Sequence, residues 1–358
     1  MTLAADSLRR LRAAVAGRDG AEQDELAKLQ ARLADVETQN QRLRERNAAI
    51  REEKKSLRRQ LRTGAGSTSA VAEVPGRTRL ELRRDCVFAS VPRDASVLEI
   101  GPAHNAILPK REGFNTRTVD YLDRAGLVQR YRDFPQYSPE DIEEVDYVLA
   151  PGAAMADVIE DRFDLVLASH VIEHTTSMID FVNESTRLLK PAGVLALVVP
   201  DHRYCFDRFR ERASLSRVID ASLAPPQVHT VGAVVEERLN AVRHRGATAW
   251  APGHRGLYSP VNDLDTVKRY AEEARRADRY IDTHNWICTP HHLRLLLQDL
   301  YELGLIALRE TFFHDTVRHE FFLNLSRDGA GSGLDRESLL VLSDGERRSL
   351  DVAEFESS

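Results

Sequence analysis

The sequence contains little cysteine and no long apolar segment. Its 358 residues include only Cys86, Cys205 and Cys288, an odd number without CxxC spacing. That pattern excludes a disulfide framework and a zinc knuckle, and it favours a reducing compartment. No run approaches the roughly eighteen apolar residues of a membrane-spanning helix, and the N-terminus lacks the apolar core of a signal peptide. We therefore expect a soluble, cytoplasmic protein.

Neither sign of charge dominates the composition. Lysine and arginine number 50 against 56 aspartate and glutamate residues, a formal net charge of −6. A protein that tracks nucleic-acid phosphates needs a basic surface, so this balance disfavours nucleic acid as a partner. With 42% hydrophobic residues, the chain can bury one full α/β core and still carry extensions.

Apolar residues from Leu26 to Leu61 recur in alternating steps of three and four. This spacing predicts a coiled coil, and the polar residues Asn40, Asn47 and Lys54 all fall at position a of its heptads. Because polar a positions fix register and favour parallel dimers, we expect a homodimer through this coil. A single charged helix in solvent is the alternative.

The second half of the predicted coil is basic. Residues 40–62 contain nine Lys/Arg and three Glu. Such a stripe could contact an anionic membrane surface or another acidic partner, and the former would place the protein peripherally at the inner face of the membrane. The alternative interpretation, a solvated face of the coil, is the more favoured one because charged outer heptad positions are common.

Composition divides the chain into four parts. We expect an N-terminal helix and coiled coil over 1–62, a flexible linker over 63–78, a main domain over 79–327 and a mostly disordered tail over 328–358. Within the main domain, residues 201–288 are too many for a simple crossover and predict a helical lid or acceptor pocket. Its helices are predicted over Phe206–Ala221, Val228–Arg243 and Asp263–Arg279.

The segment Ser96–Asn105 (SVLEIGPAHN) is the most informative motif of the main domain. A short apolar run closes on Glu99, and Gly101 then opens a turn that predicts a following helix. Ligands of open α/β sheets bind at the carboxyl ends of the strands, so this motif predicts a nucleoside site. A second predicted strand, Thr116–Asp120, ends in an acid that could hold two ribose hydroxyls.

Two further predicted strands continue the pattern. Asp164–His174 (DLVLASHVIEH) is a strand running into a helix, and an amphipathic helix over Ile179–Lys190 precedes a buried strand that ends at Pro200. After a helix over His291–Leu303, two segments, Ile306–His314 and His319–Leu325, read as a closing pair of strands.

Taken in order, the motifs EIGP, TVD, FDLVLASHVIEH and LLKPAGVLALVVPD resemble those of class I S-adenosylmethionine-dependent methyltransferases, over Leu80 to Ser326. The resemblance implies an α/β fold: a Rossmann-like seven-stranded sheet with a helical insertion after the fifth strand, here preceded by the predicted parallel coiled coil. It implies S-adenosyl-L-methionine as the cofactor. A dinucleotide-binding oxidoreductase is the structural rival, but its fingerprint requires second and third glycines that this chain lacks.

The resemblance also implies which residues contact the cofactor. Glu99 and Gly101 would shape the loop around its methionine part, Asp120 would bind the ribose, and the segment Ala154–Asp157 would flank the adenine. The chain departs from the family where Ala103 and Asn105 replace glycines. The implied cofactor set is Glu99, Gly101, Pro102, Ala103, Asn105, Asp120, Ala154, Met155, Ser169 and His170.

The acceptor should meet the cofactor above the ends of the fourth and fifth strands, at Ser169 and Pro200. A hydroxyl acceptor requires a base, and histidine titrates near neutral pH. The candidate catalytic residues are therefore His170, Asp201, His202 and His284. Trp286 is expected on the inward face of the insertion beside His284.

The string H-x-x-E-H places His170, Glu173 and His174 where two or three of them could meet a metal. Some methyltransferases similar to this chain carry E-x-x-E-H here and bind magnesium, but histidine replaces the first glutamate. The favoured interpretation is that Glu173 and His174 only cap the following helix and pack beside the cofactor. We therefore expect no metal, with a divalent ion at these three residues as the alternative.

The segments VVPDHRYCFDRFR and YIDTHNW are similar to those of methyltransferases associated with cell-surface polysaccharide synthesis. That resemblance implies O-methylation of a sugar hydroxyl in a glycan or its activated precursor, and glycan-assembly proteins as partners that the basic stripe could contact. Two alternatives stay open. One is a small-metabolite methyltransferase whose coil only dimerises, and the other is a coiled-coil scaffold whose degenerate glycine loop no longer supports turnover.

Overall fold

The computed structural model describes residues 77–133, 138–150, 153–250, 256–277 and 279–349, together with the backbone of 353–355. The chain divides into two units, Met1–Ser69 and Ala70–Ser358, and all described residues belong to the second. The predicted N-terminal helix, the coiled coil and most of the linker lie outside the described residues.

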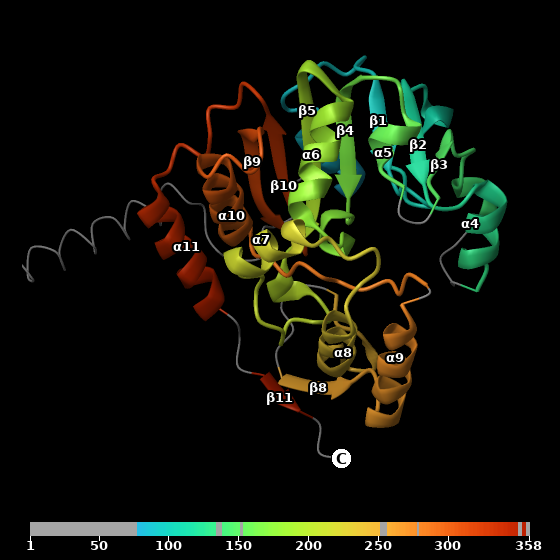
Figure 1. Cartoon of the computed structure of the whole chain (residues 1–358), viewed down its shortest axis with the longest axis vertical. Coiled ribbons are helices and arrows are strands. Elements are labelled where there is room, and N and C mark those ends of the chain that lie inside the picture. The colour runs from blue at the N-terminus through green and yellow to red at the C-terminus, as the bar shows by residue number, and fades with distance from the viewer. Residues whose placement is uncertain are drawn as a thin grey trace, which may run out of the picture. The chain divides into compact units, whose positions relative to one another are not determined.

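Seven strands form the main sheet, in the order β3-β2-β1-β4-β5-β10-β9 (Figure 1). The first five pair in parallel, whereas β10 is antiparallel to both β5 and β9. This arrangement confirms the predicted Rossmann-like sheet and its closing antiparallel pair. The strands are β1 Val97–Ile100, β2 Thr116–Asp120, β3 Tyr147–Val148, β4 Phe163–Ser169, β5 Leu189–Pro200, β9 Arg309–Val317 and β10 Glu320–Ser326.

Side chains that alternate along the central strands fill two apolar layers, one on each face of the sheet. On one face Leu98 and Val166 pack with the helices α6 (Met178–Leu188) and α10 (Pro290–Glu302). On the other, Val97 and Leu165 join residues of α3 (Arg79–Val87). Because both faces of the sheet are buried, the sequences of these strands are continuous apolar runs. Two further helices flank the sheet, α4 Arg124–Tyr131 and α5 Met155–Val158.

The prediction of a helix directly after Gly101 is wrong. The chain from β1 to β2 consists of turns and one short 3₁₀ segment, and both Gly101 (φ +59°) and Ala103 (φ +44°) are left-handed there. Left-handed residues cannot start a right-handed helix. Moreover, the Glu99 carboxylate accepts hydrogen bonds from the backbone N–H groups of Ile107 and Leu108, which fold the loop onto the face covered by α3.

The helix predicted to follow β4 directly also differs. His170 has a φ of +54°, and the next residues, Ile172–His174, form a 3₁₀ turn. Helix α6 begins only at Met178, because Ser177 caps its N-terminus by accepting a hydrogen bond from the Asp180 N–H. Glu173 and His174 therefore do not cap a helix, contrary to the favoured sequence interpretation.

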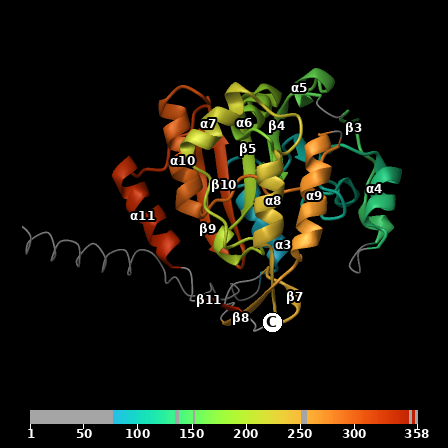
Figure 2. The same ribbon diagram turned by 60° about the horizontal axis from the view of Figure 1, so that its bottom comes forward.

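The insertion lies at the carboxyl ends of the main strands, with α8 and α9 packed against each other (Figures 1 and 2). Its first helix begins at Leu215 instead of Phe206, and its second ends at Asn240 and leads into a strand, so the purely helical prediction was incomplete. The small sheet has the order β11-β8-β6-β7. The elements are α7 Leu215–Leu223, α8 Val231–Asn240, α9 Leu264–Arg276, β6 Val242–His244, β7 Ala247–Thr248, β8 Gly256–Pro260 and β11 Ala353–Phe355.

The prediction of a disordered tail over 328–358 is wrong for Arg336–Arg348, which form α11. This helix packs against α10. Leu339 is fully buried, and Arg336 donates two hydrogen bonds, of 2.7 and 2.9 Å, to the Asp299 carboxylate on α10. Burial and a bidentate ion pair order a segment whose composition alone resembles a solvated tail.

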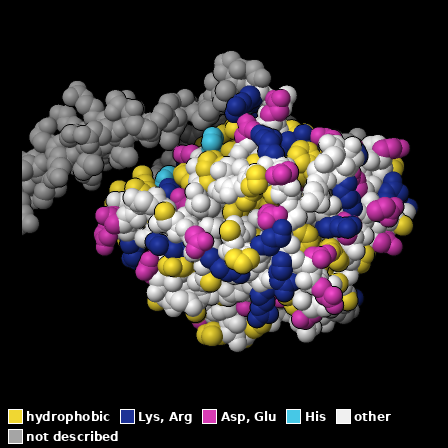
Figure 3. Space-filling model, turned by 90° about the horizontal axis from the view of Figure 1, so that it is seen from above, with side chains coloured by type: hydrophobic (Ala, Val, Ile, Leu, Met, Phe, Trp, Pro, Cys, Tyr) yellow, Lys and Arg dark blue, Asp and Glu magenta, His cyan; other side chains and the backbone are white. Residues whose placement is uncertain are grey.

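Among the described residues, no helix is long and apolar enough to cross a membrane. Cys86, Cys205 and Cys288 are buried free thiols. On the face of the molecule shown in Figure 3, basic and acidic side chains both occur across the surface.

Candidate active site

The parallel pairing of β1 with β2 and β4 sets their carboxyl ends side by side. Ile100 lies opposite both Val119 and Ala168, so the residues that follow each strand share one edge of the sheet. The Gly101 N–H donates to the Val119 carbonyl at 2.8 Å. A Cβ atom on Gly101 would lie 3.7 Å from Val171 Cγ2, so this turn contacts the segment after β4.

The loop after β1 keeps tight geometry although two glycines are replaced. Ala103 takes the left-handed conformation that glycine adopts more easily, and the Asn105 N–H donates to the Pro102 carbonyl at 2.8 Å to close a turn. Beneath the loop, Glu99 is 1% exposed and accepts from Ile107 N at 2.7 Å. Burial raises the pKa of Glu99 to about 7, against the lowering effect of the backbone N–H donors. Glu99 thus holds the loop in shape.

Asp120 ends β2 with a buried carboxylate. It is 5% exposed, and its Oδ1 accepts a hydrogen bond from the Tyr121 N–H at 2.7 Å. Burial raises the pKa of Asp120 to about 6, although backbone donors and the charge of Arg130 oppose the shift. A carboxylate so poorly solvated is stabilised by hydroxyl donors, so it fits the ribose of the cofactor expected from the sequence.

The end of β3 is joined to this edge, since the Leu149 N–H donates to the Asp120 carbonyl at 2.8 Å. Ala154 is the N-cap residue of α5, and Met155, the first residue of that helix, is 6% exposed. The Met155 N–H donates to Glu184 Oε2 at 3.0 Å. The segment expected to flank the adenine therefore begins a short helix at the same edge as Asp120.

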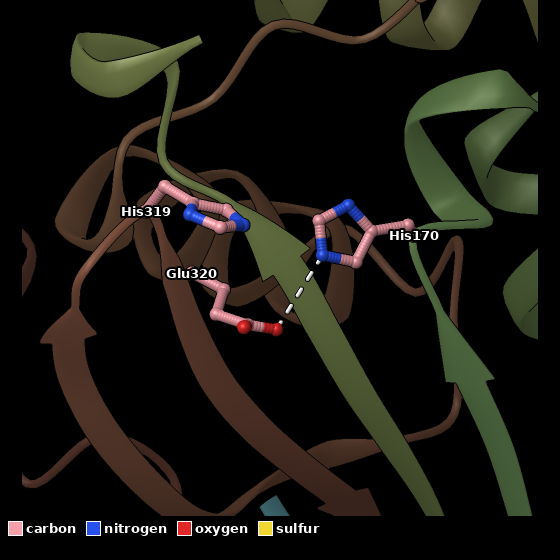
Figure 4. Close-up of side chains that lie close together, drawn as sticks. All are labelled: His170, His319 and Glu320. Carbon is pink, nitrogen blue, oxygen red and sulfur yellow. Dashed lines mark hydrogen bonds and ion pairs between the residues drawn. The ribbon is translucent and has the colours of Figure 1, made fainter. Parts of the chain in front are cut away.

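His170 follows Ser169, the last residue of β4, and lies between two carboxylates. Its backbone N–H donates to the Val198 carbonyl, and its side chain is 22% exposed. Nε2 lies 3.4 Å from Glu320 Oε2 (Figure 4), and Nδ1 lies 3.5 Å from Glu173 Oε1. A histidine oriented by a carboxylate is the usual arrangement of a general base.

Glu320 is itself anchored by two arginines of α3. Arg83 donates to Glu320 Oε2 at 2.7 and 2.9 Å, and Arg79 Nε donates to Oε1 at 2.7 Å. Burial alone would raise the pKa of Glu320, but His170 and the two arginines outweigh it and hold the pKa well below the ordinary value. The carboxylate beside His170 is therefore ionised and fixed in position.

His319 precedes Glu320 and faces the same cluster (Figure 4). Burial lowers the pKa of His319 to about 4, so the ring is neutral at pH 7 and its Nε2 accepts from Arg79 Nη2 at 3.2 Å. The Trp250 ring lies 5.2 Å from the ring of His319 and 5.8 Å from that of His170. Phe206 stacks on Trp250 at 5.5 Å. An aromatic surface therefore adjoins the candidate base.

Two predicted catalytic residues at the end of β5 have other partners. The Asp201 carboxylate accepts hydrogen bonds from Arg203 and, at 2.6 Å, from the Thr316 hydroxyl. His202 is 4% exposed, and its Nε2 lies 3.2 Å from the Asp207 carbonyl. Burial lowers the pKa of His202. Asp201 and His202 therefore hold neighbouring segments together through these contacts, none of which involves His170.

The predicted inward pair of the insertion is divided. Trp286 points inward, but it is 3% exposed in the apolar core, and its Nε1–H donates to the Thr175 hydroxyl at 3.1 Å, so it packs in the core and not beside the histidines at the sheet edge. His284 lies beside the Trp250 ring, at 6.0 Å, with its Nδ1 3.2 Å from Asp207 Oδ2. Burial alone would lower the pKa of His284, but Asp207 reverses this effect and raises it.

The H-x-x-E-H residues separate into two groups. His170 turns its Nε2 to Glu320 and its Nδ1 to Glu173. Glu173, His174 and His284 form a group whose ligand atoms all lie within 4.8 Å of one another. His174 Nδ1 also lies 2.9 Å from Asp282 Oδ1. The alternative metal set of His170, Glu173 and His174 is therefore not one of the two groups of possible ligands found among the described residues, although His170 and His174 both lie near Glu173.

The sequence analysis missed Arg79, Arg83, Trp250, His319 and Glu320. Only the two arginines carried a local signal, because they are four residues apart and so share one face of a helix. Glu320 is 237 residues from Arg83 and 150 from His170. Nothing in the neighbouring sequence indicates such pairings.

A model of the methyltransferase-domain family matches residues 34–300, which is more than half of the chain. A comparison with curated proteins found no match. Among solved structures, the CcbJ methyltransferase from Streptomyces caelestis is 13% identical, covers 71% of this chain and 99% of its own, and has a TM-score of 0.36. An S-adenosylmethionine-dependent methyltransferase from Clostridium acetobutylicum is 11% identical, covers 77% of this chain and 99% of its own, and has a TM-score of 0.37. The glycopeptide N-methyltransferase MtfA is 11% identical, covers 70% of this chain and 91% of its own, and has a TM-score of 0.34.

Proposed function

Because the chain belongs to the methyltransferase-domain family and is an S-adenosylmethionine-dependent methyltransferase, we propose that it methylates a sugar hydroxyl of a glycan or its activated precursor. The observation that carries this proposal is the His170–Glu320 pair at the carboxyl end of β4. Removal of the hydroxyl proton requires a base near neutral pH, and an ionised carboxylate that orients a histidine supplies one.

The residues at the ends of β1 and β2 suit the cofactor. Gly101 and Ala103 form the tight loop, Asp120 offers a carboxylate oxygen to the ribose hydroxyls, and Met155 lies at the adenine side. Bound S-adenosylmethionine supplies an electrophilic methyl group. The protein has only to align the acceptor with it and to remove one proton.

The proton is received at a defined atom. When His170 donates its Nε2–H to Glu320, its Nδ1 holds the lone pair that accepts the acceptor's proton, and the resulting Nδ1–H lies on the side of Glu173 Oε1, which is 3.5 Å away. Glu320 then stabilises the imidazolium, and Arg79 and Arg83 prevent the carboxylate from turning away. Glu320 acts through His170 and is a positioning residue.

The aromatic surface supports a sugar as the acceptor. Both rings come from the insertion: Trp250 lies beside His170 and His319, and Phe206 stacks on Trp250. Aromatic rings bind the apolar faces of sugars while their hydroxyls stay available for polar contacts. A ring hydroxyl directed at His170 would thus lie between the insertion and the sheet edge.

The test is a methyl-transfer assay with labelled S-adenosylmethionine and a panel of monosaccharides, nucleotide sugars, glycan extracts, amines and small phenols. We expect label in a sugar product, located on oxygen by mass spectrometry, and at least a 100-fold loss of rate in His170→Asn. Calorimetry with S-adenosylhomocysteine confirms that this variant still binds the cofactor product. Label only in amines or phenols, or full activity of the variant, would contradict the proposal.

A further inference from the structure

We propose that Glu173, His174 and His284 form a binding site for a divalent transition-metal ion of the Zn²⁺ class. The ligand atoms of the three side chains lie within 4.8 Å of one another. Glu173 and His174 belong to the 3₁₀ turn after β4, and His284 belongs to the extended segment that precedes α10. The site thus joins the sheet edge to the insertion.

The state of Glu173 is the first argument. Its residue is 1% exposed, and neither carboxylate oxygen has a hydrogen-bond partner. The His170 and His174 nitrogens approach Oε1 only to 3.5 and 3.9 Å. A buried carboxylate without hydrogen bonds is costly unless a cation neutralises it. One of its oxygens lies within 4.8 Å of a ring nitrogen of each of His174 and His284, where an ion would satisfy it.

The orientation of the histidines is the second argument. His284 Nδ1 lies 3.2 Å from Asp207 Oδ2, and His174 Nδ1 lies 2.9 Å from Asp282 Oδ1, although the latter pair is not aligned as an ideal hydrogen bond. A proton on each Nδ1, facing a carboxylate, leaves the Nε2 lone pair for a metal. Metal-bound histidines are commonly held by carboxylates in this way.

The donor set decides the class of ion. Two imidazoles and one carboxylate suit Zn²⁺ and its neighbours, whereas Mg²⁺ prefers oxygen ligands and octahedral geometry. His174 Nε2 and Glu173 Oε1 are 3.9 Å apart, and ligands on a tetrahedral zinc are about 3.4 Å apart, so a small side-chain rotation closes the site. Three protein ligands would leave one position for water or another oxygen.

A second group of possible metal ligands is a weaker candidate for the ion. His170, His319 and Glu320 also lie within 4.8 Å of one another. However, Arg79 and Arg83 already neutralise the Glu320 carboxylate, and a cation added there would face two positive charges. His319, a member of this second group, therefore serves as the matched control for ligand identity.

The test measures metal binding to the full chain, with any affinity tag removed and the protein stripped by a chelator. Calorimetry with Zn²⁺ should show one equivalent bound, and Co²⁺ should give the visible absorption of a tetrahedral site. We expect Glu173→Gln and His284→Asn to weaken Zn²⁺ binding at least 100-fold, and His319→Asn to change it less than threefold. His174→Asn, at a side chain that is 26% exposed, supplies a variant less prone to unfold.

The proposal is overturned if the wild-type chain binds no Zn²⁺, or if binding survives in the Glu173 and His284 variants. Loss of binding in His170→Asn together with retention in His284→Asn would assign the ion to the H-x-x-E-H string instead. Circular dichroism of each variant shows that it is folded. Because the readout is binding of the metal alone, the result does not depend on which acceptor is methylated.

Discussion

Replacement of Glu320 by glutamine tests the link between the α3 arginines and the candidate base. The wild-type side chain is 2% exposed and accepts hydrogen bonds from Arg79 and Arg83 while its Oε2 faces His170. Glutamine keeps the shape and one acceptor oxygen but removes the charge. The variant therefore leaves Arg83, which is 14% exposed, without its counter-ion.

The magnitude follows from burial. Removing one partner of a buried ion pair costs about 3–5 kcal/mol. Because Arg79 is 43% exposed and glutamine retains one acceptor, we expect the lower end, a loss of about 3 kcal/mol in the free energy of unfolding at pH 7. We also expect kcat to fall about 100-fold, since His170 loses the carboxylate that orients it, with cofactor affinity nearly unchanged.

The effect on stability should depend on pH. The pKa of Glu320 in the folded protein is lowered from the ordinary 4.5, so its stabilising contribution is complete above pH 4.5 and is lost as the pH falls below that value. Urea unfolding between pH 7 and pH 3 should show a steeper loss of stability in the wild type than in the variant.

Glu310→Gln is the matched control. Glu310 pairs with Arg294 through two contacts of 2.8 Å and is 12% exposed, but it lies near the start of β9, away from His170. Both variants should be destabilised, and only Glu320→Gln should lose kcat. Equal activity of the two variants, or wild-type stability of Glu320→Gln, would refute the reasoning.

Three further predictions concern the cofactor loop and the core. Asp120→Asn should weaken S-adenosylhomocysteine binding about tenfold, as measured by calorimetry. The same variant should raise the free energy of unfolding at pH 7 by about 2 kcal/mol, because burial raises the pKa of Asp120 to about 6 and ionisation of the wild-type carboxyl therefore costs stability. A variant less stable than the wild type would contradict this. Gly101→Ala should cost about 1–2 kcal/mol in urea unfolding, because alanine is strained at φ +59°. Burial lowers the pKa of His292 to about 3, so the wild type should lose stability as the pH falls from 6.5 toward 3, by about 4 kcal/mol at most. His292→Gln should show a shallower loss over that range, and identical pH profiles would exclude the histidine as the cause.

Much of the fold could be predicted because its signals are local. The continuous apolar runs before Gly101 and Pro200 form strands wherever both faces can be buried, and the acid that ends Thr116–Asp120 was placed at the sheet edge correctly. The left-handed residues after β1 and β4 were not visible, because Ala103 and His170 adopt that conformation only through contacts made by the rest of the molecule.

The candidate site was predicted in part. Asp120 and His170 follow their strands as expected, but Trp286 packs in the core, and Trp250 takes the place beside the histidines. Both tryptophans lie in the same insertion, and their sequence neighbourhoods do not distinguish a core ring from a site ring. Which one is buried depends on how the insertion folds back on the sheet.

By itself the sequence determined the parallel strands and the acids at their ends, since adjacent residues decide backbone preference and burial pattern. Only the tertiary structure decided which charges meet. Glu320 reaches His170 and the α3 arginines because β10 inserts beside β5, and His284 reaches Glu173 because the segment before α10 crosses the same edge. Electrostatic partners act over a few ångströms in space, whatever their separation along the chain.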